Sequence, residues 1–210
     1  MKLPTLAECQ RLFEQYKIPS TVRQHCQTVY RVATVLADQL IATGYPLRKE
    51  VVGPLALLHD FMKAVVIERL GGDPFYQYTP TAEEVAMHQE LRQKYAGLSE
   101  TYVTYLLLKD QYPEFAQLFL ELDQFTRNPQ TPVQEETKFI HYVDWRVLGN
   151  KVVPLKKRMD YIYERYGLWI EKKNIDWEEA KNEQFEYEHK IFNCLPFTAE
   201  ELGEKWMEKR

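Results

Sequence analysis

Apolar residues recur along the chain at intervals of three and four positions, which is the spacing of one face of an α-helix. Between residues 20 and 44 this spacing is regular, a serine or threonine at the start can cap a helix, and Gly44 can end it. The apolar positions of this stretch are Val22, Val29, Val32, Leu36 and Leu40. The pattern predicts a long amphipathic helix with one buried face.

A second helix is predicted from Leu47 to Leu70, with two glycines after it to end it. Residues 51–58 are apolar on nearly every side, which is typical of a central, buried helix. The pair His59 and Asp60 follows this run directly. A buried carboxylate is costly unless something compensates its charge, so the pair either lies at the surface or binds something.

Further helix starts follow along the chain. A capping box at Thr81 precedes one helix, Ser99 another, and a C-terminal pair is expected from residues 176–194 and from Thr198 to the end. Prolines suited to a first helical turn stand at Pro113, Pro132 and Pro154. Strand patterns do not appear. We therefore predict an all-α fold, a single domain over residues 1–210 with about eight or nine helices.

Composition and charge narrow the function classes. A formal charge of −4 gives no basic field for nucleic acid, and the short basic cluster at residues 151–158 is read as a solvated helix face. The three cysteines are widely spaced and form no CxxC motif, which favours a reducing compartment and no thiolate zinc site. No apolar stretch approaches the roughly 20 residues of a membrane helix. We expect a soluble, cytoplasmic protein without a membrane partner.

Candidate chemistry comes from polar residues on apolar helix faces. His25 lies three positions after Val22 and four before Val29, so its imidazole belongs to the buried stripe. Asp144 lies four positions after Ile140 and three before Val147, and it too is predicted to point inward.

A single core histidine that bonds to the backbone is commoner than a metal ligand, but a buried aspartate is rare. His25, the pair His59 and Asp60, and Asp144 together favour a metal site. Imidazole and carboxylate ligands suit Mn, Fe, Co, Ni or Zn, and the set leaves coordination positions for water and substrate. Neighbouring residues on a helix point about 100° apart, so one pair cannot enclose an ion and other helices must complete its shell.

The order of these residues resembles the H…HD…D motif of the HD-domain superfamily of metal-dependent phosphohydrolases. The segment PLALLHDFMK is similar to the family's "AALLHDIGK" helix, and VRQHCQTVYRVATVLADQL to its first motif helix. FIHYVDWRVLGNKVVPLKKRMDYIYERYG resembles the last motif helix of small prokaryotic members. The resemblance covers about residues 20–167, the HD-like core, and leaves 168–210 as a helical extension.

The resemblance implies roles for particular residues. His25, His59, Asp60 and Asp144 would bind a divalent metal ion (Mn, Fe, Co, Ni, Zn or Mg), one per chain, and Asp60 would take part in catalysis. Lys63 matches the lysine of HDxxK and would neutralise phosphate oxygens of the substrate. A solvated lysine at a helix end is the alternative.

His88 resembles a histidine that several HD subfamilies use for a second metal or for the phosphate. Members with two metals carry a further histidine before the last aspartate, where this chain has Asp123 in LELDQFT. We therefore predict one ion, with His88 facing the substrate as a catalytic residue or hydrogen-bonding structurally. His141, three residues before Asp144, could share its helix face, and it is expected either to support a ligand or to be structural.

The predicted function is hydrolysis of a phosphate ester, a nucleotide or similar small metabolite, by a metal-activated water. Arg23 and Arg146 are candidate contacts for the substrate phosphate. The alternative is a regulatory HD protein that binds metal or nucleotide without turnover, and a di-iron oxygenase would need more ligands than this chain offers.

Overall fold

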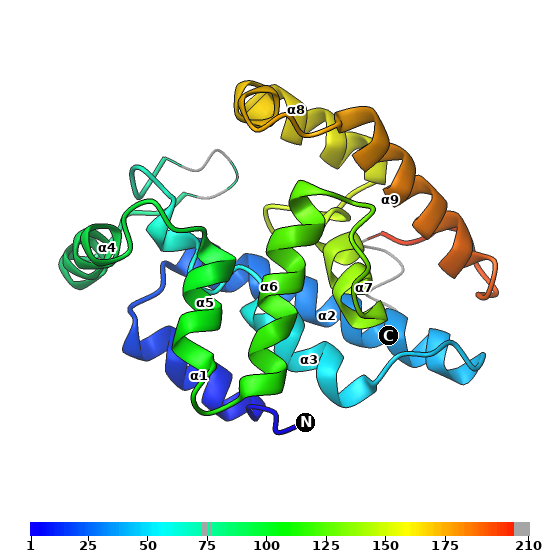
Figure 1. The fold of residues 1–210 in the computed structure, drawn as a ribbon, viewed down its shortest axis with the longest axis horizontal. Coiled ribbons are helices and arrows are strands. Elements are labelled where there is room, and N and C mark those ends of the chain that lie inside the picture. The colour runs from blue at the N-terminus through cyan, green and yellow to red at the C-terminus, as the bar shows by residue number, and fades with distance from the viewer. Residues whose placement is uncertain (73–74, 76, 204–210) are drawn as a thin grey trace.

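The computed structural model describes residues 1–72, 75 and 77–203, and this part of the chain is an all-α bundle of nine helices, as predicted (Figure 1). A 3₁₀ turn, η1, and two short strands complete it. The elements in chain order are α1 (Leu6–Gln15), α2 (Ser20–Ala42), α3 (Lys49–Leu58), η1 (Lys63–Val65), α4 (Ala82–Lys94), α5 (Glu100–Leu108), α6 (Pro113–Arg127), α7 (Glu135–Asp144), β1 (Val147–Leu148), β2 (Lys151–Val152), α8 (Leu155–Lys172) and α9 (Trp177–Phe192).

The core lies where α2, α3 and α7 meet. α2 packs along α3, and α7 contacts both of them. The predicted apolar stripe of α2 is fully buried at Val29, Val32, Leu36 and Leu40. α6 packs between α5 and α7, and α1 closes the side of α3 (Figure 1). The three helices that carry the candidate ligands are therefore packed against one another.

Several predicted helix starts are confirmed. Thr81 caps α4 with a complete capping box, and the Ser99 hydroxyl accepts a hydrogen bond from the backbone N–H of Tyr102 at the start of α5. Pro113 stands in the first turn of α6. Pro132 is different, because α7 begins only at Glu135, three residues after the proline.

The predicted helix from residue 47 to residue 70 is wrong, since α3 ends at Leu58. Beyond it the backbone bonds become tighter: the Phe61 N–H donates to Leu58 O, and the Lys63 N–H to Asp60 O. Phe61 is completely buried and meets the rings of Phe13 and Tyr16 edge-on, with 5.6 Å between centroids in both pairs. Packing of Phe61 against α1 therefore accompanies the turn that ends the helix.

A small hairpin follows α7, which the sequence pattern did not predict. Val147 pairs with Val152 and Leu148 with Lys151, around a two-residue turn. Gly149 in this turn has φ +62°, a conformation that favours glycine. Strands of two residues are too short to show an alternating pattern.

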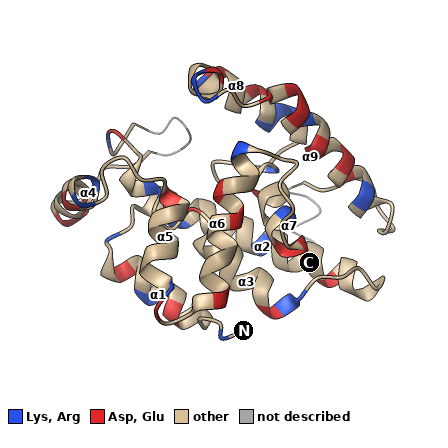
Figure 2. Cartoon of the chain, in the orientation of Figure 1, with Lys and Arg blue, Asp and Glu red and all other residues tan. Residues whose placement is uncertain are grey.

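α8 and α9 lie together along one edge of the molecule, and basic and acidic side chains are mixed along both helices (Figures 1 and 2). α9 packs on α7, so this C-terminal part is joined to the core. The helix expected from Thr198 is not formed over residues 198–203, and residues 204–210 lie outside the described part.

The length and the hydropathy of a helix decide whether it can cross a membrane. Among the described residues, every helix is too short or too polar to cross a bilayer.

Candidate metal centre

Three helices bring their polar residues to one place. His25 comes from the second turn of α2, His59 directly follows α3, and Asp144 is the last residue of α7. One ligand atom from each of these residues lies within 4.8 Å of the other two. The predicted inward faces of α2 and α7 therefore meet at the end of the buried α3 helix.

A backbone carbonyl contacts the Nδ1 atom of each imidazole and orients the ring. His25 Nδ1 lies 2.9 Å from the carbonyl oxygen of Gly149, and His59 Nδ1 lies 2.7 Å from that of Ala56. A carbonyl only accepts, so each Nδ1 must carry the proton and donate it. In a neutral ring the other nitrogen then has a free lone pair, which is the arrangement commonly found for metal-binding histidines.

Both Nε2 atoms face the same carboxylate. The distance to Asp144 Oδ1 is 2.9 Å for His25 and 3.6 Å for His59. The Nε2 of His59 is buried and has no hydrogen-bond partner in the described part of the chain. A nitrogen lone pair and a carboxylate oxygen repel each other, so this contact requires a proton or a metal ion between them.

Asp60 borders the same group. Its Oδ2 lies 4.0 Å from His25 Nε2, and its Oδ1 lies 3.4 Å from the ammonium of Lys63. Lys63 also donates to Glu100 Oε1 at 2.7 Å. Lys63 is thus held between two carboxylates, one of which belongs to the candidate ligand set.

The electrostatic surroundings keep the carboxylates ionised. Burial alone would raise the pKa of Asp144, but the two imidazoles that face it, from His25 and His59, and the charge of Arg158 hold it well below its usual value. Burial would also raise the pKa of Asp60, yet Lys63 and the two histidines leave it lowered. Two anionic side chains at neutral pH suit a divalent cation.

The pKa of His59 shows the pull of the same carboxylates. Burial lowers it, but Asp60 and Asp144 outweigh this effect and the net shift is upward. The site therefore attracts positive charge, whether a proton or a metal ion provides it.

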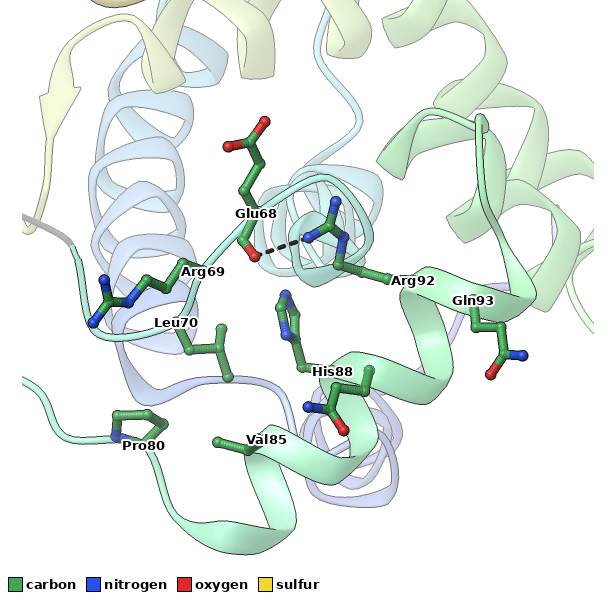
Figure 3. A pocket seen from close by; sticks show the side chains of 9 residues that line it. Glu68, Arg69, Leu70, Pro80, Val85, His88, Arg92 and Gln93 are labelled. Carbon is green, nitrogen blue, oxygen red and sulfur yellow. Dashed lines mark hydrogen bonds between the residues drawn. The ribbon is translucent and has the colours of Figure 1, made fainter.

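His88 lies apart from the four candidate ligands. It lines a cavity of about 520 Å³ between α4 and the segment that follows η1, and none of the four candidate ligands lines this cavity (Figure 3). Its Nε2 donates to the carbonyl of Ile67 at 2.8 Å, and Arg92 nearby donates to the carbonyl of Glu68. These contacts join α4 to the segment after η1, which fits the structural alternative for His88.

The two arginines predicted to contact the substrate phosphate donate hydrogen bonds to other groups of the protein. Arg146 is 2% exposed and its guanidinium bonds to Tyr142, Glu188 and the carbonyls of Val153, Ala199 and Leu202. Arg23 donates from Nε to the carbonyl of Ile18 at 2.7 Å. We leave Arg146 out of the proposed substrate contacts, because every one of its nitrogens already donates to a protein acceptor.

Other residues considered from the sequence lie apart from this group. Asp123 accepts from Thr101 and pairs with Arg127, and among the described residues it belongs to no cluster of possible metal ligands. His141 is buried between the rings of Phe125 and Trp145.

Three residues of the site escaped the sequence analysis. Gly149 contributes only a backbone carbonyl, and Glu100 contributes only an ion pair with Lys63, which is distant in the sequence. Neither residue therefore stands out in a sequence pattern. Arg158 belongs to the basic cluster that was read as solvated, but its side chain is 15% exposed and lies 3.7 Å from Asp144. Lys156 in the same cluster is 76% exposed and fits that reading. Lys156 and Arg158 are two positions apart on α8, so they lie on different faces of the helix.

Comparisons with known proteins give no family for this chain. No family model, curated protein or solved structure matches it.

Proposed function

We propose that the protein is a metal-dependent phosphohydrolase of the HD-domain type. The observation that supports this most is the pair of imidazoles whose Nδ1 atoms donate to backbone carbonyls while both Nε2 lone pairs face Asp144. The contact distances of 2.9 and 3.6 Å suit ligands of one ion, because ligand atoms bound at about 2.1 Å lie about 3 to 4 Å apart. A core histidine with a structural role does not need this arrangement.

His25, His59, Asp60 and Asp144 would hold the ion. When bound, a divalent ion lowers the pKa of water and neutralises charge on phosphate oxygens. Nitrogen and oxygen ligands without thiolate suit Mn, Fe, Co, Ni or Zn, and Mg is the further candidate. One ion per chain is expected, since neither His88 nor Asp123 joins the ligand set.

The side chains around the ligands would stabilise the charge that develops during hydrolysis. Hydrolysis adds a water oxygen to phosphorus and breaks the ester P–O bond, and the leaving oxygen takes a proton as inorganic phosphate forms. Lys63 stays protonated, because Asp60 and Glu100 outweigh burial and hold its pKa well above the usual value. It therefore offers a fixed positive charge for the negative charge that develops on phosphate.

Metal analysis followed by an activity screen tests the proposal. Protein purified without chelator should contain about one equivalent of divalent metal, and Asp144→Asn should lose it. Nucleotides and sugar phosphates, assayed with Mn, Co, Ni and Mg, should include a substrate whose hydrolysis stops when EDTA removes the ion. A wild-type chain that binds no divalent metal at micromolar concentration would contradict the proposal. Metal binding without hydrolysis of any phosphate ester would favour a regulatory protein instead.

A further inference from the structure

Arg158 is a cation with unused donors next to the candidate metal centre. It lies in the second turn of α8, and its Nη2 is 3.7 Å from Asp144 Oδ1. That distance allows charge attraction but is too long for a hydrogen bond. The Nε of Arg158 is buried and has no hydrogen-bond partner among the described residues. A buried N–H without a partner is costly, so this arginine is poorly satisfied in the protein alone.

The two cations beside the centre differ in how their charge is used. Lys63 pairs with both Asp60 and Glu100. Arg158 has Asp144 as its acidic neighbour, and Asp144 already faces two histidines. Arg158 is therefore the cation with more unused hydrogen-bond donors for an anionic ligand, while Lys63 contributes its charge.

An aromatic ring limits the movement of this guanidinium. Its carbon lies 5.6 Å from the centre of the Tyr161 ring, which is within the range of a cation–π contact. Tyr161 in turn meets Phe75 edge-on, at 5.3 Å between centroids. A guanidinium oriented in this way loses less conformational freedom when a ligand binds.

We propose that Arg158 binds the phosphate of the substrate through a two-pronged contact, and that the substrate is a phosphate monoester. This inference rests on the proposed function. A guanidinium fork takes two phosphate oxygens, and the metal centre requires a third. A monoester has three non-bridging oxygens and meets this demand, whereas a diester has only two.

Phosphate binding to the metal-loaded protein tests the role of Arg158. Titration calorimetry with inorganic phosphate and Mn²⁺-loaded protein should give an affinity that falls at least tenfold in Arg158→Gln. Arg158→Lys keeps the charge but loses the fork, and its affinity should lie between those of the wild type and Arg158→Gln. Lys156→Gln is the matched control on the same helix, because its ammonium is exposed and pairs with Asp160, and it should bind phosphate like the wild type.

Mn²⁺ content, measured on the same samples, separates the possible results. Unchanged Mn²⁺ with unchanged phosphate affinity in Arg158→Gln would overturn the role of Arg158 and leave the proposed function standing. Loss of Mn²⁺ in both Arg158 variants would show that Arg158 only positions Asp144, and it would overturn the inference as well. A wild-type protein that takes up no Mn²⁺ would refute the proposed function and this inference with it.

Two model esters test the substrate class. The wild-type protein loaded with Mn²⁺ should hydrolyse p-nitrophenyl phosphate with a kcat/KM at least tenfold above that for bis(p-nitrophenyl) phosphate. Equal or faster hydrolysis of the diester would overturn the assignment to monoesters.

Discussion

Two buried histidines of this core differ in what their ring nitrogens meet. His59 donates to the Ala56 carbonyl and directs its second nitrogen at Asp144. His141 is also buried, but neither of its ring nitrogens has a hydrogen-bond partner among the described residues. Carboxylates attract a positive charge to His59, whereas the aromatic rings of Phe125 and Trp145 enclose His141. Burial of a histidine therefore has opposite consequences at these two positions.

Protonation of His141 should destabilise the fold at acidic pH. Burial lowers the pKa of His141 to about 4, below its ordinary 6.5, so the unfolded chain binds the proton more tightly. The stability from neutral His141 is full above pH 6.5 and is lost as the pH falls toward 4, up to about 3 kcal/mol. Urea unfolding of His141→Leu should show a flatter pH profile than the wild type in this window.

The control for this effect is His189→Leu, which changes an exposed histidine on α9. It should keep the wild-type slope of unfolding free energy against pH. An unchanged slope in His141→Leu would show that His141 is not the group that titrates.

Asp60 and Lys63 should give different phenotypes. Asp60→Ala removes a carboxylate 4.0 Å from His25 Nε2, so we expect weaker metal binding and no hydrolysis. Lys63→Ala should keep the metal and lower kcat/KM at least tenfold, because its charge acts on phosphate rather than on the ion. Metal content by atomic absorption, with kinetics on the same preparations, distinguishes the two. Loss of metal from Lys63→Ala would contradict this division of roles.

Sequence reasoning at the residue scale succeeded where one helix holds the information. The spacing of His25 and Asp144 relative to apolar neighbours predicted that both lie on buried faces, and the structure brings them within 2.9 Å. Glu100 could not be found in this way, since its pairing with Lys63 joins residues 37 positions apart. Arg158 was missed because a basic run gives no sign of which member turns inward.

At the scale of elements, local signals predicted where helices begin better than where they end. A capping residue acts through its own helix, so Thr81 and Ser99 could be read directly. α3 ends where Phe61 packs against α1, a contact that no local pattern contains. The apolar run from residue 51 to residue 58 nevertheless indicated correctly that α3 is buried.

The capping box of α4 provides a test at this scale. The Thr81 hydroxyl accepts from the Glu84 N–H at 3.2 Å, and Glu84 Oε2 accepts from the Thr81 N–H at 2.8 Å. Thr81→Ala should lower the free energy of unfolding by about 1 kcal/mol in urea titrations, without changing metal content.

α1 has the same capping box, formed by Thr5 and Glu8, and offers a matched comparison. Thr5→Ala should cost a similar amount, because its contacts have the same pattern and nearly the same lengths. A change in metal affinity on Thr81→Ala, without a change on Thr5→Ala, would show that α4 supports the centre.

At the scale of the whole molecule, Arg146 joins the core to the C-terminal extension. Its guanidinium pairs with Glu188 of α9 at 2.7 Å and donates to the carbonyls of Ala199 and Leu202. The sequence divided the chain near residue 167 into an HD-like core and an extension, and these contacts cross that boundary. The sequence could not predict which helices pack together, because the apolar pattern of one helix does not identify the helix that covers it.

Removal of one partner should show how strongly the extension supports the core. Glu188→Ala leaves the Arg146 charge buried without its carboxylate, so we expect a loss of about 3 kcal/mol in unfolding free energy. Glu178→Ala on the same helix removes an exposed pair with Lys181 and should cost less than about 0.5 kcal/mol. Equal effects of the two substitutions in urea unfolding would argue against this coupling.

Gly149 contributes to the candidate metal centre without a reactive side chain. Its carbonyl accepts a hydrogen bond from His25 Nδ1, its φ of +62° suits glycine, and a Cβ there would lie 2.8 Å from Cβ of Phe75. Any other amino acid must move either the ring or the carbonyl. A mutant library restricted to histidine, acidic and basic residues would leave out Gly149. We nevertheless expect Gly149 to tolerate as few substitutions as a metal ligand does.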